Sequence, residues 1–232
     1  MENSFGTLIK ANNYKSEDRW YPISVDSFRN GFIAMRGDVD GYHPLVDNLA
    51  YNLQYIQFIE KAIDELEVSS VIYTMLVKNY VITGIGIIEG VFSYIIKTNG
   101  WWKTKDEEVV LNSCAQQTTS EGVTLVIRTE ISKKVDPYMD KMNFDEMIRC
   151  LKRHHAALKV DHLLYPQLDR IRDLRNRVHL QKGENPKDTD YNAFDYQVRK
   201  QMKEILYAVL CSPKVTDSRA IHNYDFLKPN KE

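Results

Sequence analysis

Apolar residues in the first half of the chain recur at helical spacing. Over residues 45–66 they return at steps of three and four, which predicts an amphipathic helix. A longer apolar stretch follows over residues 71–96, and Ser69 or Ser70 is placed to cap it. Because this second segment is apolar on nearly all sides, we expect it to be the central helix of a bundle.

The second segment contains three glycines, Gly84, Gly86 and Gly90. Each costs up to about 1 kcal/mol in a helix interior, which indicates that another helix crosses closely there. Its most apolar run, residues 80–96, is shorter than the roughly 20 residues that span a membrane, and Glu89 lies in its middle. We therefore expect a buried helix and no membrane association.

The pattern changes after the second helix. Residues 101–135 hold two β-branched runs separated by the polar "QQTTSEG", which predicts a β-hairpin or loop inserted between helices. Helical spacing resumes after Asn143, a candidate N-cap. It continues in helices expected over residues 165–181, with a proline in the first turn, and over residues 191–210.

The two ends of the chain lack a clear period. Residues 1–44 are expected to form loops with a short strand or two, and residues 212–232 an irregular tail. The predicted fold class is therefore all-α: a helical bundle over residues 45–211 with a small β-hairpin insertion at 101–135 and an irregular N-terminal segment.

Composition narrows the classes of function. The chain of 232 residues is 43% hydrophobic and 27% charged, and its net charge is −1, so polyanion binding would need a local basic cluster. Cys114, Cys150 and Cys211 are far apart, which fits reduced thiols in the cytoplasm. The N-terminus lacks the pattern of a secretory signal. We expect no metal site and no cofactor, because no histidine, cysteine or carboxylate set has a ligand spacing.

The segment "RIRDLRNRVHLQ", residues 170–181, carries the candidate chemistry. On a helix, Arg170, Asp173 and Arg177 lie on the solvent side, where Asp173 and Arg177 are spaced for a surface ion pair. The other charged residues, Arg172, Arg175 and His179, fall within about 60° of one another. They border the apolar face, with Asn176 beside them.

This edge combines groups suited to RNA cleavage. Arginine binds phosphate in bidentate geometry, and histidine titrates near neutral pH. A histidine can take the proton of a 2′-hydroxyl or give one to a leaving 5′-oxygen, while an arginine neutralises the charge that develops on the phosphate. The competing interpretation is that these side chains cap the core or form ion pairs between subunits.

An all-α bundle whose late helix carries an arginine, a polar residue and then a histidine resembles the HEPN superfamily. Its ribonucleases carry an arginine, four to six residues and a histidine. Arg172 reaches His179 across six residues; Arg175-Asn176 has the favoured dipeptide but only three residues before His179. The resemblance covers residues 45–211. It implies a catalytic set of Arg175 and His179, supported by Asn176 and Arg172.

The resemblance also implies partners and chemistry. It implies metal-independent cleavage of an RNA substrate to 2′,3′-cyclic phosphate ends, in a homodimer whose motif helices pair, and a role as a toxin or defence effector with an antitoxin or defence partner protein. Glu89 is expected either to orient Arg172, Arg175 or His179, or to escape to solvent. Lys152 and Arg153 in "KRHH" are candidate RNA-binding residues, and a solvated helix end is the alternative.

Two other function classes fit the same residues. The first is a non-catalytic helical module that binds nucleotide, RNA or protein, which the short spacing from Arg175 to His179 favours. The second is a structural dimerisation domain, in which Arg175 serves subunit association alone.

Overall fold

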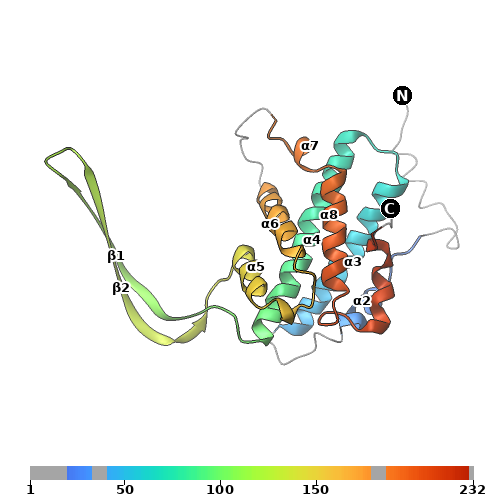
Figure 1. Cartoon of the computed structure of the whole chain (residues 1–232), viewed down its shortest axis with the longest axis horizontal. Coiled ribbons are helices and arrows are strands. Elements are labelled where there is room, and N and C mark those ends of the chain that lie inside the picture. The colour runs from blue at the N-terminus through green and yellow to red at the C-terminus, as the bar shows by residue number, and fades with distance from the viewer. Residues whose placement is uncertain (1–19, 33–40, 179–186, 230–232) are drawn as a thin grey trace.

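Two long helices form the centre of the molecule, as the apolar periodicity predicts. In the computed structural model, which describes residues 20–32, 41–178 and 187–229, α3 spans Tyr42–Glu65 and α4 spans Ser70–Thr98. They pack side by side as a helical hairpin (Figure 1). Of the two candidate caps, Ser69 is the N-cap residue of α4 and Ser70 is its first helical residue.

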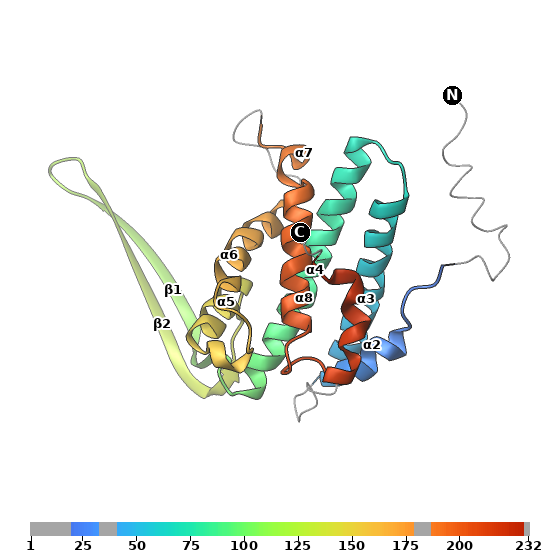
Figure 2. The same cartoon turned by 45° about the vertical axis from the view of Figure 1, so that its right-hand side comes forward.

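Helix α4 is the central helix of the bundle. It packs against α3 and against α5, α6 and α8 from the C-terminal half (Figure 2). A Cβ atom at Gly84 would lie 2.6 Å from the Met202 methyl, and one at Gly90 would lie 3.1 Å from Leu45. Glycine at these two positions therefore permits the close crossing that we predicted. The prediction is wrong for Gly86, where a Cβ atom would meet nothing within 4 Å.

On length and composition alone, α4 also qualifies as a candidate membrane span. Half of its most apolar window is buried inside the protein, however, and a core helix passes the same test. Its buried side chains, such as Ile85, Ile88 and Phe92, pack in the common core of the bundle. This packing accounts for the apolar composition of the helix.

The described residues of the C-terminal half contribute four α-helices to the bundle: α5 (Phe144–Arg153), α6 (Leu164–Arg175), α7 (Asp190–Ala193) and α8 (Tyr196–Leu210). The predicted cap Asn143 accepts a hydrogen bond from the Glu146 amide at 2.9 Å, and the Glu146 carboxylate accepts one from the Asn143 amide at 2.8 Å. This reciprocal capping box fixes the start of α5.

Two of the predicted helices are shorter than expected. The helix predicted over residues 165–181 ends as an α-helix at Arg175, and a tighter 3₁₀ turn follows at Asn176–Val178. Asparagine has a low helix propensity, and Arg177 turns forward to pair with Asp188. The helix predicted over residues 191–210 is split into α7 and α8, because the Asp195 side chain caps a new helix by accepting from the Val198 amide.

The predictions for the chain ends are wrong for one segment at each end. Residues 25–31 form a helix, α2 (Val25–Gly31), instead of a loop or strand, and Ser24 caps it by accepting from the Ser27 amide. Residues 1–19 and 33–40 lie outside the described residues. In the tail, Ser218–Leu227 form a 3₁₀ run with Tyr224 and Leu227 buried. Their packing against α2 and α8 orders a segment that has no period of its own.

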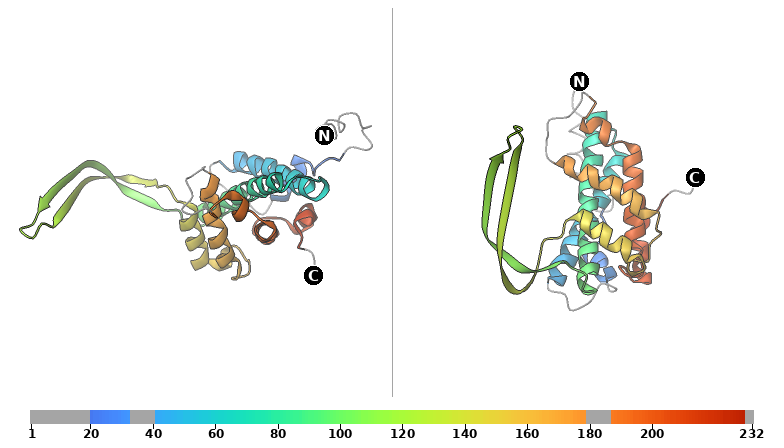
Figure 3. Two further views of the ribbon diagram at one scale, coloured as in Figure 1. Left: turned by 90° about the horizontal axis from the view of Figure 1, so that it is seen from above. Right: turned by 60° about the vertical axis from the view of Figure 1, so that its left-hand side comes forward.

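The predicted β insertion is a hairpin, and it is longer than expected. Strands β1 (Thr104–Thr118) and β2 (Thr124–Met139) pair antiparallel in a two-stranded sheet. The hairpin projects away from the bundle, as the left-hand view of Figure 3 shows. Nearly every residue of both strands is exposed, so the pairing is local and adds nothing to the bundle core.

A buried ion network joins α3 to α8. Glu60, only 3% exposed, accepts hydrogen bonds from Arg199 at 2.7 Å and from Lys203 at 3.1 Å. Arg199 also pairs with the more exposed Asp64 at 2.6 Å. Burial lowers the pKa of Arg199, but Glu60 and Asp64 raise it by more, so its guanidinium remains charged. The network fixes how these two helices face each other.

Candidate functional site

The candidate site lies along α6, at the edge that the helix shares with α4 and α5. The helical spacing of Leu164, Ile171, Leu174 and Val178 predicts that they share the core side of this helix. Leu164 and Ile171 are buried, and Leu174 packs partly buried against the core. This packing fixes the rotation of α6, and with it the direction in which its arginines leave the helix.

Arg175 contacts the central helix. Its Nη2 atom lies 2.8 Å from Oε2 of Glu89, and the side chains are 43% and 25% exposed. Of the two interpretations of Glu89, contact with an arginine of α6 is therefore the one found in the structure. The pair leaves one side of the guanidinium open to solvent while the other is held by a carboxylate. Arg175 is thus oriented at the surface, at the last α-helical residue of α6.

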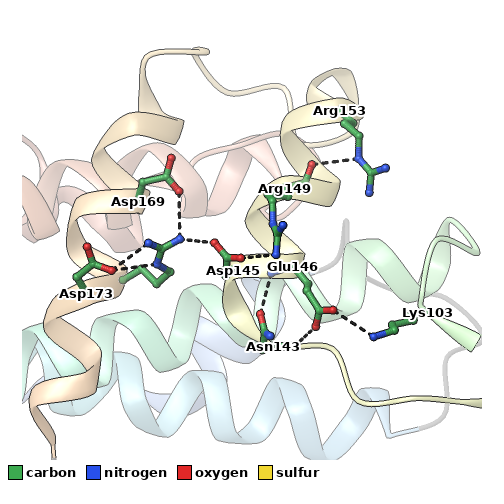
Figure 4. Close-up of polar contacts among 9 residues, drawn as sticks. Lys103, Asn143, Asp145, Glu146, Arg149, Arg153, Asp169 and Asp173 are labelled. Atoms are coloured by element: carbon green, nitrogen blue, oxygen red, sulfur yellow. Dashed lines mark hydrogen bonds and ion pairs between the residues drawn. The ribbon is translucent and has the colours of Figure 1, made fainter. Parts of the chain in front are cut away.

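Arg172 points to a different helix. Its guanidinium pairs with Asp145 at the start of α5, lies 3.8 Å from Asp169, and contacts Asp173 at 3.0 Å. Figure 4 shows these three carboxylates around one guanidinium. The hydrogen bond with Asp173, followed by the charges of Asp145 and Asp169, raises the pKa of Arg172. The two arginines therefore contact separate partners, Arg175 on α4 and Arg172 on α5.

The predicted surface pair between Asp173 and Arg177 is wrong. Asp173 instead forms an ion pair with Arg172, and Arg177 forms one with Asp188. The change from α-helix to 3₁₀ turn after Arg175 removes the i,i+4 geometry on which the expected pair depended. Asn176 is exposed at the start of this turn. His179, the predicted acid–base residue, lies outside the described residues.

A second cluster surrounds the groove between α5 and the base of the hairpin. Lys152 and Arg153, predicted from the sequence as RNA-binding, both line this groove, whose volume is about 730 Å³. Half of the other residues that line it are basic or aromatic, namely Trp101, Lys103 and Arg149, and the rest are Met142, Glu146 and Cys150. Lys103 and Arg149 were not among the residues predicted from the sequence. Arg149 lies one helical turn before Arg153, and this spacing could have indicated that both line the same groove. No feature of the sequence indicated Lys103.

The paired tryptophans are anchors of this groove. The Trp101 ring stacks on His154 with centroids 4.0 Å apart and planes 13° apart. The Trp102 indole N–H donates to the Asp140 carbonyl at 2.8 Å, and Lys97 lies 4.7 Å from its ring centroid. These contacts anchor Trp102 in its loop, while Trp101 presents a stacked, half-buried ring to the groove.

A single carboxylate connects the α6 edge to the groove. Asp145 pairs with Arg172 of α6 and with Arg149 of α5, as the dashed lines in Figure 4 show. Asp145 and Arg172 are 27 positions apart, and no local spacing in the sequence predicts their contact. The result is a line of alternating charges from α6 to the wall of the groove.

The described part of the chain holds no group of three or more histidine, cysteine or acidic side chains that would bind a metal ion. The side chains described along α6 and in the groove are guanidinium groups, lysines and carboxylates, with Trp101 stacked on His154. In comparisons with known proteins, no family model, no curated protein and no solved structure matches the chain.

Proposed function

We propose that this protein is a metal-independent endoribonuclease of the HEPN type. In this proposal His179 takes the proton from a 2′-hydroxyl, and the 2′-oxygen attacks the adjacent phosphorus. The bond from phosphorus to the 5′-oxygen breaks, the leaving oxygen takes a proton, and a 2′,3′-cyclic phosphate remains. Arg175 neutralises the charge that develops on the phosphate oxygens.

The observation that carries the proposal is the ion pair between Arg175 and Glu89. An arginine that served only solubility would not need a carboxylate from the otherwise apolar face of α4. Here the carboxylate holds one edge of the guanidinium at 2.8 Å, and the side chain remains 43% exposed. A guanidinium that is oriented in advance and open on one side is suited to binding a phosphate in bidentate geometry.

The groove beside α5 supports RNA as the substrate class. Lys152 and Arg153 are exposed there, and neither forms an ion pair with a side chain in the described parts of the chain. Lysines and arginines of this kind bind the phosphate backbone whatever the base sequence. The half-buried ring of Trp101 lies in the same groove, where a base can stack on it.

The proposal includes a homodimer in which the helices that carry Arg175 face each other. It also includes a cytoplasmic role as a toxin or defence effector, held in check by an antitoxin or defence partner. These elements rest on the resemblance to HEPN ribonucleases.

The test is cleavage of single-stranded RNA in excess EDTA. Wild-type protein is expected to produce cyclic phosphate ends. His179→Ala and Arg175→Ala are each expected to lower the rate about a hundredfold or more. Arg170→Ala is the matched control, because Arg170 is an exposed arginine of the same helix. Equal rates for wild type and His179→Ala would refute the proposal.

One observation favours a non-catalytic RNA-binding module instead. Both arginines of the motif are compensated by carboxylates, Arg172 by three of them, which weakens their attraction for phosphate. This alternative predicts RNA binding that depends on Lys152 and Arg153 but no product on long incubation. A cyclic phosphate product that disappears in Arg175→Ala would exclude it.

A further inference from the structure

The projecting hairpin has a free edge along β2. A two-stranded hairpin is marginally stable alone in water, and a third strand or a covering helix ordinarily stabilises it. Here neither strand is covered by the bundle, and both outer edges leave backbone groups unpaired (Figure 1). Large apolar side chains on the strands are about half exposed: Leu111, Leu125, Ile127 and Ile131. Such an edge is a template for another strand.

The charges on β2 indicate which strand would pair with its free edge. Near the base of the hairpin, Lys133 pairs with Glu108 at 2.9 Å, and Lys134 pairs with Asp106 at 3.0 Å. Farther out, Arg128 and Glu130 lie on one face of β2, and neither forms an ion pair with any residue that the structure describes. Arg128 and Glu130 have opposite charges and are two positions apart. When two identical strands run antiparallel, the arginine of each strand can therefore lie opposite the glutamate of the other.

We propose that β2 pairs antiparallel with β2 of a second copy of this chain, centred on Thr129. In this register Arg128 lies opposite Glu130 of the other copy, and the reciprocal pair forms at the symmetry-related position. Ile127 likewise lies opposite Ile131 of the other copy. The two hairpins then form one continuous four-stranded sheet.

The alternation of hydrogen-bonded residues along β2 is consistent with this register. The Thr119 amide donates to the Val123 carbonyl, and the pairing is regular from Thr118 opposite Thr124 to Leu111 opposite Ile131. Bonded pairs alternate along such a ladder, so odd-numbered residues of β2 bond to β1 and even-numbered residues direct their backbone groups to the free edge. Arg128 and Glu130 are even-numbered, which lets them exchange backbone hydrogen bonds with the second copy.

The apolar side chains gather on the opposite face. Leu111 pairs with Ile131 and Ala115 pairs with Ile127 within the hairpin. In the proposed sheet the two isoleucines of each copy meet those of the other in non-hydrogen-bonded pairs, where side chains approach most closely. One face thus becomes an apolar strip across four strands, and the other carries the two ion pairs.

Charge reversal tests the register. Arg128→Glu puts two pairs of like charges into the contact, and so does Glu130→Arg. Each is expected to raise the dissociation constant of the β2–β2 contact about tenfold, measured by sedimentation velocity over a concentration series. Mixing the two variants makes both pairs complementary again, so heterodimers are expected at the wild-type affinity. Glu121→Arg, in the exposed turn, is the control of equal charge change.

A cross-link gives an independent measurement. In a Cys114→Ser background, Thr129→Cys places two thiols opposite each other, with Cα atoms about 4.5 Å apart, and a disulfide between copies is expected. Ser132→Cys places them roughly 20 Å apart, so it should not cross-link.

A wild type that is monomeric at all concentrations would overturn the proposal and leave the edge to a different protein. Association that neither reversal weakens, or equal cross-linking of both cysteine variants, would also overturn it. The contact is separate from the pairing of motif helices. Because it is measured as association, its failure is distinguishable from a failure to cleave RNA.

Discussion

Replacing Glu89 by glutamine tests whether this carboxylate positions Arg175 or only stabilises the bundle. The substitution keeps the shape of the side chain and removes its charge. The pair that it breaks has a 2.8 Å contact, but the two side chains are 43% and 25% exposed. Ion pairs this exposed contribute about 0.2–1 kcal/mol, because water screens the charges. The free energy of unfolding should therefore fall by less than about 1 kcal/mol.

The effect of Glu89→Gln on RNA cleavage should be larger than its effect on stability, and both KM and kcat should change. Without the negative charge of Glu89, the phosphate meets a more positive site, so KM should fall. The guanidinium also loses the contact that orients it, so kcat should fall about tenfold, less than in Arg175→Ala. Urea denaturation and steady-state cleavage in EDTA measure the two effects. Glu65→Gln is the control, because Glu65 belongs to an exposed ion pair on α3.

Two results would refute this reasoning. A loss of more than 2 kcal/mol of stability would mean that Glu89 is a structural residue of the α4–α6 contact. An increase in kcat together with the fall in KM would mean that the carboxylate restrains the arginine instead of positioning it.

Three further predictions follow from the fold. Glu60→Gln should cost about 3 kcal/mol in urea denaturation, because it leaves buried cations undercompensated, whereas Asp64→Asn should cost under 1 kcal/mol, because Asp64 is 56% exposed; equal losses would contradict the network. Asn143→Ala should cost about 1 kcal/mol through loss of the capping box, and an unchanged melting curve would show that the cap is dispensable. An alkylating reagent at pH 8 should modify exposed Cys114 first, since burial raises the pKa of the Cys211 thiol to about 11; mass spectrometry that finds Cys211 modified as fast would contradict this.

Local signals predicted the parts of the fold that depend on neighbours in the chain. The apolar periods of α3 and α4 indicated both helices to within a few residues, because burial on one face follows directly from side-chain spacing. Asn143 indicated the start of α5, because asparagine is a preferred N-cap residue. The β-branched runs indicated the hairpin but understated its length. Its strands extend to Met139 through exposed residues, where no burial pattern marks an end.

The candidate site was predictable only in part. The sequence singled out Arg172 and Arg175, and the rotation of α6 follows from its apolar side. The partners of these two arginines were harder to predict from the sequence. Glu89 was noticed because a charge among apolar residues stands out, but nothing local indicated that Arg175, and not Arg172, would meet it. The end of α6 at Arg175 was missed because it depends on a contact from Arg177 to the later segment that holds Asp188.

The sequence by itself determined where the two central helices form, which face of α6 is buried, and that arginines border the core on this late helix. These properties depend on spacings of three or four residues. Only the tertiary structure decided that Arg172 meets Asp145 across 27 positions, that Arg199 meets Glu60 across 139, and that the hairpin projects without a cover. Such contacts depend on how rigid helices pack against one another, and that packing is set by the whole core at once.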